Sequence, residues 1–265
     1  MDIKRFIAVP DEKPLDHIVE DGGFTKVFRS IACIGDSLSS GEFESNCSNG
    51  GTGYHDFFEY SWGQYIAREA GINVLNFSRG GMTAKEYDES FAAMNGFWSE
   101  DKLCQAYIMA LGVNDLFGKN QEVGTVEDIN IDNRFANKPT FAGYYAKIIQ
   151  SMKTMQPKAM FFLMTMPRTE DEEKNKKKGE HAELLYRMAD FFDHTYVIDL
   201  YQYAPVYDAE FRRNFYLGGH MNPAGYILTA KMVMSYIDYI VRHNPEDFAQ
   251  VGFIGKPYYN AKVKW

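Results

Sequence analysis

The chain has 265 residues, of which 45% are apolar and 15% aromatic, enough for one large globular domain with a sizeable core. Its net charge of -8, from 36 acidic and 28 basic residues, argues against nucleic acid or an anionic membrane surface as the main partner. No segment approaches membrane-spanning length, and residues 1–10 contain no apolar stretch of signal-peptide length. The sequence as given therefore predicts a cytoplasmic protein.

The termini and the apolar runs predict the order of the elements. Residues 1–26 are polar and predict an extension lying over a single domain that spans 1–265, and residues 250–265 predict a tail. Apolar runs predict strands at 27–34, 72–77, 106–111, 159–166 and 196–200. Periodic and capping patterns predict helices at 56–70, 140–155, 170–193 and 223–242, the last with Asn222 as its N-cap.

Strands that alternate with helices predict an α/β fold, a parallel sheet covered by helices on both faces. Because strand–helix–strand crossovers are right-handed, the carboxyl ends of all the strands lie at one edge of the sheet. Ligands of open α/β sheets bind at that edge, so we expect the chemistry of the chain there.

Ser37 follows the first strand directly, in the run Ile31-Ala32-Cys33-Ile34-Gly35-Asp36-Ser37-Leu38. A serine at this point is a candidate nucleophile. Glycine, aspartate and serine are also common turn formers, so the stretch alone indicates either a nucleophile or a simple turn.

Three further places fall on the same edge. Gly80-Gly81, after the second strand, leave backbone N–H groups open to an anion or form a turn with positive φ. Asn114, after the third strand, presents an amide to an oxyanion or caps a helix. His220, in a glycine-framed loop before the last helix, is a candidate base. Together with Ser37, these residues are the set that acyl transfer requires.

Four blocks in this order resemble the GDSL/SGNH hydrolase family of esterases and lipases. The blocks are Gly35-Asp36-Ser37-Leu38, Asn76 with Gly81-Met82-Thr83, Gly112-Val113-Asn114-Asp115, and His220-Met221-Asn222-Pro223. The resemblance covers about 33–226. It implies a flavodoxin-like three-layer α/β/α sandwich with a five-stranded parallel sheet, Ser37 as nucleophile and His220 as base. It also implies an oxyanion hole made by the Ser37 N–H, the Gly81 N–H and the Asn114 side chain.

One position departs from the family pattern. The family usually has an aspartate three residues before the histidine, and here that residue is Leu217. Loss of the triad acid lowers the turnover of a serine protease by roughly 10⁴-fold. Asp199, Asp208, Glu210 or a backbone carbonyl are candidates to replace it, and a Ser37–His220 dyad is the remaining alternative.

Residues 42–56 are rich in glycine and asparagine and predict a long loop after Ser37. Tyr54 in this loop is either a stacking surface for substrate or a solvated residue, whereas Trp62 is expected in the core. Cys33, Cys47 and Cys104 are widely spaced, and Cys33 and Cys104 are expected as buried free thiols.

The resemblance and the residues together predict a serine esterase acting on small acyl esters. The polar, glycine-rich surroundings of Ser37 favour a short acyl group, such as acetyl on a carbohydrate. The alternative is a catalytically weakened carbohydrate-binding or regulatory protein on the same fold, suggested by Leu217. No metal or organic cofactor is implied, because the cysteines and histidines lack ligand spacing and the acidic run at 128–133 lacks the calcium-loop glycine and glutamate.

Overall fold

The computed structural model describes residues 7–264 and shows a three-layer α/β/α sandwich. Its central sheet is parallel throughout, with the strand order β4-β1-β5-β6-β7. The strands are β1 (Ser30–Gly35), β4 (Asn73–Ser78), β5 (Ala106–Ala110), β6 (Met160–Met164) and β7 (Thr195–Ile198). The predicted fold class and all five predicted strands are confirmed, with small differences in their ends.

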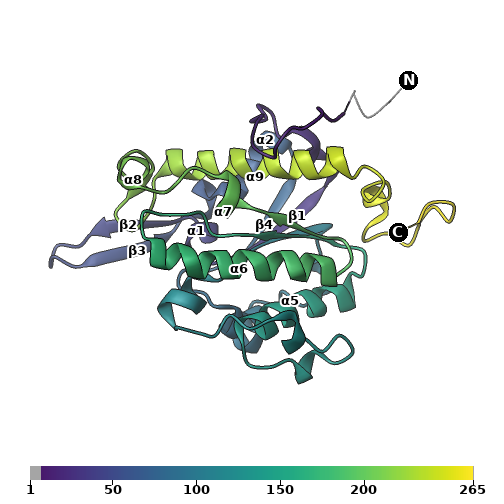
Figure 1. Cartoon of the computed structure of the whole chain (residues 1–265), viewed down its shortest axis with the longest axis horizontal. Coiled ribbons are helices and arrows are strands. Elements are labelled where there is room, and N and C mark those ends of the chain that lie inside the picture. The colour runs from purple at the N-terminus through teal and green to yellow at the C-terminus, as the bar shows by residue number, and fades with distance from the viewer. Residues whose placement is uncertain (1–6, 265) are drawn as a thin grey trace.

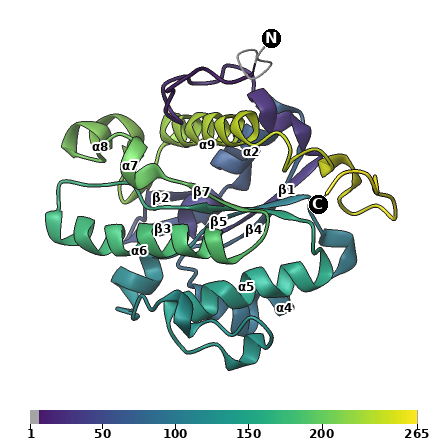
Figure 2. The same ribbon diagram turned by 45° about the vertical axis from the view of Figure 1, so that its right-hand side comes forward.

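Helices cover both faces of the sheet, as Figures 1 and 2 show. On one face lie α2 (Trp62–Ala70) and α9 (Pro223–His243), and on the other α3 (Ala84–Glu86), α4 (Ala92–Met94), α5 (Phe141–Met155) and α6 (Glu172–Phe191). Successive strand residues point to opposite faces, so Ile31 and Cys33 join one core while Ala32 and Ile34 join the other. Apolar runs without polar alternation are what a sheet buried on both faces requires.

Capping residues account for where the long helices begin. Asn222 Oδ1 accepts from Gly225 N–H at the start of α9, and Thr140 Oγ1 accepts from Gly143 N–H at the start of α5. The helix predicted from residue 56 begins only at Trp62, because Ser61 Oγ accepts from Gln64 N–H. Gly71, with a φ of 65°, ends that helix as predicted.

The prediction of a long loop over residues 42–56 is wrong. This segment is an antiparallel hairpin of β2 (Glu42–Asn46) and β3 (Thr52–Asp56), which follows the short helix α1 (Ser37–Ser40) and projects at the left of Figure 1. Tyr226 of α9 donates its hydroxyl to Glu42 O at 2.8 Å and so ties the base of the hairpin to the helix layer.

Four further short elements lie between β7 and α9. They are α7 (Leu200–Tyr203), α8 (Ala209–Phe215), and the small hairpin of β8 (Tyr216–Leu217) and β9 (His220–Met221). Residues ahead of β1 contact α9, since Val19 N–H donates to Ser235 Oγ and Phe24 N–H donates to Asp238 Oδ1. No helix in residues 7–264 is long and apolar enough to cross a membrane.

Candidate active site

Ser37 is the first residue of α1, directly beyond the carboxyl end of β1. Asp36 caps this helix, because its side chain accepts from Leu38 N–H at 3.1 Å. The hydrogen bonds of the described residues employ the N–H groups of Leu38, Ser39 and Ser40 but leave that of Ser37 without an acceptor. A free N–H at a helix start suits a developing oxyanion.

Asp36 is an unusual capping carboxyl. It is buried, and burial, together with the nearby charges of Asp115 and Glu42, raises its pKa to about 7. Asp115, from the block after β5, accepts from Ala84 N–H at 2.8 Å, and its burial raises its pKa to about 6. The two buried carboxyls thus hold the loops that carry Ser37, Gly81 and Asn114 in place.

Asn114 contacts the backbone of the residue that follows Gly81. The side-chain amide of Asn114 donates to Met82 O at 3.2 Å, which joins the loop after β5 to the loop after β4. Gly81 has a φ of 70°, and its N–H has no acceptor among the described residues. Gly81 thus has both of the features expected from the sequence: it lies in a turn with positive φ, and its backbone N–H is open to an acceptor. Asn114 begins a π-helical turn, Asn114–Gly118.

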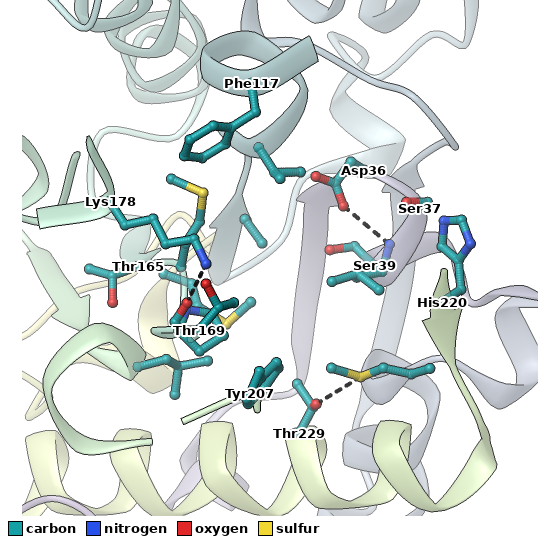
Figure 3. Close-up of a pocket in the computed structure, with 18 of the residues that line it drawn as sticks. Asp36, Ser37, Ser39, Phe117, Thr165, Thr169, Lys178, Tyr207, His220 and Thr229 are labelled. Atoms are coloured by element: carbon teal, nitrogen blue, oxygen red, sulfur yellow. Dashed lines mark hydrogen bonds between the residues drawn. The ribbon is translucent and has the colours of Figure 1, made fainter. Parts of the chain in front are cut away.

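His220 is the first residue of β9 and lies beside Ser37, as Figure 3 shows. Its Nδ1 is 2.8 Å from Glu44 Oε1, and its Nε2 is 3.0 Å from Glu42 Oε1. Both glutamates come from β2, where they share one face because they are two residues apart. In the described residues no hydrogen bond joins Ser37 Oγ to His220.

Glu44 occupies the position that a triad acid would take. Its Oε1 also accepts from Gly219 N–H at 2.8 Å, so one carboxylate oxygen fixes the imidazole and the backbone next to it. A side chain at Gly218 or Gly219 would collide with this carboxylate. The double glycine before His220 therefore makes room for Glu44.

None of the three carboxylates proposed from the sequence contacts His220. Asp199 accepts from the hydroxyls of Thr165 and Tyr186 and caps α7. Asp208 caps α8, and Glu210 is exposed near Arg213. The carboxylate at His220 Nδ1 comes instead from Glu44 of the hairpin, 176 positions away in the sequence. The one available sequence signal was the pair Glu42 and Glu44 at strand spacing just after Ser37.

The Glu42 carboxylate contacts His220 Nε2, the nitrogen that would have to accept the proton of Ser37. The same carboxylate also lies against Gly80, where any side chain would collide with it. Burial raises the pKa of Glu42, and the charges of Asp56 and Glu44 act in the same direction, whereas His220 lowers it. His220 is thus held between two carboxylates.

A cavity of about 590 Å³ opens beside Ser37 and His220 and extends over the ends of β5, β6 and β7 to α6. Buried apolar or aromatic groups form much of its wall, among them Trp62, Leu200, Tyr207 and Met221. This finding corrects the expectation of a mainly polar surrounding. Trp62 is in the core as predicted, and Tyr54 is exposed, with its ring centroid 6.0 Å from that of His220.

A family model described as "GDSL-like Lipase/Acylhydrolase family" matches residues 33–228, which include all four blocks. The chain belongs to this family. Membership in the GDSL-like family supports a hydrolase of the esterase or lipase kind. A comparison with curated protein sequences finds no match.

Solved structures similar to this GDSL-like chain share its fold at low sequence identity. A Corynascus thermopiles (Myceliophthora fergusii) carbohydrate esterase family 2 enzyme plus carbohydrate binding domain has 14% identity and a TM-score of 0.56, over 79% of this chain and 65% of that one. A Clostridium thermocellum family 3 carbohydrate esterase has 16% identity and a TM-score of 0.52, over 81% and 97%. A possible lipase from Chitinophaga pinensis has 15% identity and a TM-score of 0.50, over 82% and 98%.

Two other sequence predictions can be compared with the structure. Cys33 and Cys104 are buried free thiols, as predicted, and Cys47 is exposed. Asp128, in the run compared with a calcium loop, forms an ion pair with Lys138 at 2.8 Å and accepts from Thr140 Oγ1 at 2.9 Å. Its carboxylate therefore organises the approach to α5.

Proposed function

We propose that this GDSL-like protein is a serine esterase that hydrolyses small acyl esters through an acyl-enzyme on Ser37. The observation that carries the proposal is the contact between His220 Nδ1 and Glu44 Oε1, next to a serine at the start of α1. A carboxylate on Nδ1 holds the imidazole in the tautomer whose Nε2 accepts a proton, and it stabilises the imidazolium that forms.

The reaction follows from these positions. As Ser37 Oγ attacks the ester carbonyl, His220 Nε2 takes its proton, and the Glu42 carboxylate leaves this nitrogen. The oxyanion rests on the free N–H groups of Ser37 and Gly81 and on the Asn114 amide. The alcohol leaves with the proton from His220, and a water activated by the same nitrogen then hydrolyses the acyl-enzyme.

We further propose an acetylated carbohydrate as one substrate class. The names of two structurally similar proteins identify them as carbohydrate esterases. Tyr54, 60% exposed and edge-on to His220, offers an aromatic face on which a sugar ring could stack. The net charge of -8 supports a small neutral or carbohydrate partner over nucleic acid or an anionic membrane. The free thiols agree with a cytoplasmic location.

One observation favours the second candidate, a catalytically weakened carbohydrate-binding or regulatory protein. Glu42, rather than Ser37, faces His220 Nε2 at 3.0 Å. Apo sites often tighten their catalytic hydrogen bonds only with substrate bound, so this contact alone does not decide between the two functions.

Hydrolysis of p-nitrophenyl acetate by the wild type and by Ser37→Ala separates the candidates. The esterase proposal expects release of nitrophenol to fall to the buffer rate in Ser37→Ala, with the fold retained by circular dichroism. Equal rates for the two proteins would refute it and leave the binding protein as the better account.

A further inference from the structure

The cavity beside Ser37 is much larger than an acetyl group needs. Its volume of about 590 Å³ lies in the range that accommodates small-molecule ligands. Figure 3 shows Ser37 and His220 on one side of this space and Lys178 of α6 on the other. A substrate whose ester carbon lies at Ser37 would therefore extend toward Lys178.

Lys178 is a cation inside the wall of this cavity. The residue is only 8% exposed, and its Nζ donates to Pro167 O at 2.8 Å. No carboxylate in residues 7–264 forms an ion pair with it, although an ammonium has three N–H donors. Burial lowers its pKa to about 8, the charge of Lys174 acts in the same direction, and the charge of Asp171 acts in the opposite one. Buried charges are normally paired, so this ammonium lacks an anion.

Two hydroxyl groups near the cavity also lack partners. Thr169 and Ser39 line the cavity, and their buried hydroxyl oxygens have no hydrogen-bond partner among residues 7–264. Figure 3 shows Thr169 on the Lys178 side and Ser39 on the Ser37 side. Buried polar atoms are rarely left unpaired in native proteins.

The other charged groups of the cavity wall are already engaged or lie at its mouth. Lys174 forms an ion pair with Asp171 at 3.1 Å, and both side chains are well exposed. The exposed Arg212 stacks over the ring of Tyr216 at 4.6 Å. Glu170 is exposed. Lys178 is thus the buried cation of the cavity wall that no carboxylate in residues 7–264 contacts, although the charge of Asp171 acts on it from a distance.

We propose that this cavity binds esters that carry a carboxylate, and that Lys178 pairs with this carboxylate while Ser37 attacks the ester. The inference rests on the proposed esterase function and adds a substrate class to it. The carboxylate can belong to the acyl part, as in a half-ester of a dicarboxylic acid, or to the alcohol part, as in the acetyl ester of a hydroxy acid.

Matched pairs of esters test both sources. In the first series, p-nitrophenyl half-esters of succinate, glutarate, adipate and suberate are each compared with the uncharged fatty acyl ester of equal length. In the second, the acetyl esters of hydroxy acids are compared with alkyl acetates of equal length. The ratio of kcat/KM for the charged and uncharged member is measured within one protein, so a reduced folded fraction cancels.

In the wild type we expect the charged member to be preferred by about 10-fold to 100-fold in one of the two series, as a hydrogen-bonded charge pair allows. Lys178→Met abolishes the preference, and Lys178→Arg retains part of it. Lys177→Met is the matched control, because Lys177 Nζ donates to Leu116 O and Asn120 Oδ1 and does not line the cavity. A wild-type ratio near one in both series, or a preference that survives Lys178→Met, overturns the proposal.

If the protein were not an esterase, no ester of either series would be hydrolysed in a Ser37-dependent manner. That result differs from hydrolysis that shows no preference for the charged ester. The carboxylate site is still tested in that case by titration calorimetry of the wild type with adipate monoamide and hexanamide. Tighter binding of the charged amide, lost in Lys178→Met, supports the site. Equal binding of the two amides overturns it.

Discussion

Glu44 Oε1 lies 2.8 Å from His220 Nδ1, although the two residues are 176 positions apart in the sequence. The contact joins the β2–β3 hairpin to the loop before α9, and it puts a carboxylate where Leu217 cannot provide one. Leu217 itself is half exposed and pairs with His220 across the small β8–β9 hairpin. The position three residues before His220 therefore holds a leucine, and the carboxylate that contacts His220 Nδ1 comes from β2.

The variant Glu44→Gln tests whether Glu44 serves as the acid that Leu217 cannot provide. We expect kcat for p-nitrophenyl acetate to fall by roughly 10²–10⁴-fold, because an amide neither fixes the tautomer nor stabilises the imidazolium as a carboxylate does. The matched control is Glu210→Gln, at an exposed glutamate near Arg213, which should leave kcat unchanged. Loss of activity in the control and retention in Glu44→Gln would contradict the assignment.

Replacement of Glu42 should raise the activity, whereas replacement of Glu44 should lower it. The Glu42 carboxylate competes with Ser37 for His220 Nε2, so Glu42→Ala is expected to raise kcat/KM by up to about fivefold, which corresponds to roughly 1 kcal/mol of ion-pair attraction. Glu42→Gln should give a smaller gain, because its amide can still donate to a neutral Nε2. Steady-state kinetics would disprove competition if Glu42→Ala lost more than tenfold, since the carboxylate would then take part in the reaction.

Tyr54 provides a test of the carbohydrate class. Because its ring is exposed beside His220, Tyr54→Ala should raise KM for an acetylated sugar about tenfold with little change in kcat, and Tyr54→Phe should preserve KM. KM for p-nitrophenyl acetate, which carries no sugar, serves as the control. A change of the same size for both substrates would mean that Tyr54 supports the hairpin rather than the sugar.

Asp36 should make the stability of the protein depend on pH. Its pKa is raised from 3.8 to about 7 in the folded chain, so between these values the folded state holds a proton that the unfolded state has released. The stabilisation is fully present below pH 3.8 and is lost as the pH rises through about 7.

Asp36→Asn keeps the capping oxygen and removes this titration. Urea unfolding should therefore show that the variant gains stability over the wild type as the pH rises from 4.5 to 8, by about 1.4 kcal/mol for each unit of the pKa shift at most. Parallel curves for the two proteins across this range would show that Asp36 does not titrate as described.

The sequence predicted the sheet because its central strands β5 and β6 are apolar on both sides, as burial between two helix layers demands. It also placed Ser37, Gly81, Asn114 and His220 at one edge, since a parallel sheet brings strand ends together whatever their separation in sequence. The β2–β3 hairpin escaped prediction because it is a two-stranded, largely exposed ribbon with polar residues on both strands. Its two glutamates carry no pattern that points to a histidine near the other end of the chain.

The cavity beside Ser37, unlike the positions of the strand ends, could not be predicted from the sequence. The wall beside Ser37 combines side chains from α2, α6, α9 and the loops after three strands, and no local pattern predicts that these groups leave a space between them. Lys178 illustrates this point. In the sequence it belongs to a run of charged residues typical of a solvated helix face, yet the structure buries it.

Covalent labelling of Ser37 tests the central claim most directly. The wild type is incubated with diethyl p-nitrophenyl phosphate, which phosphorylates an activated serine nucleophile, and the peptides are mapped by mass spectrometry. The account predicts one diethylphosphoryl group on the peptide that contains Ser37, loss of esterase activity in proportion to labelling, and no label in Ser37→Ala. A protein that hydrolyses p-nitrophenyl acetate while Ser37 stays unlabelled, or that carries the label on another residue, would contradict it.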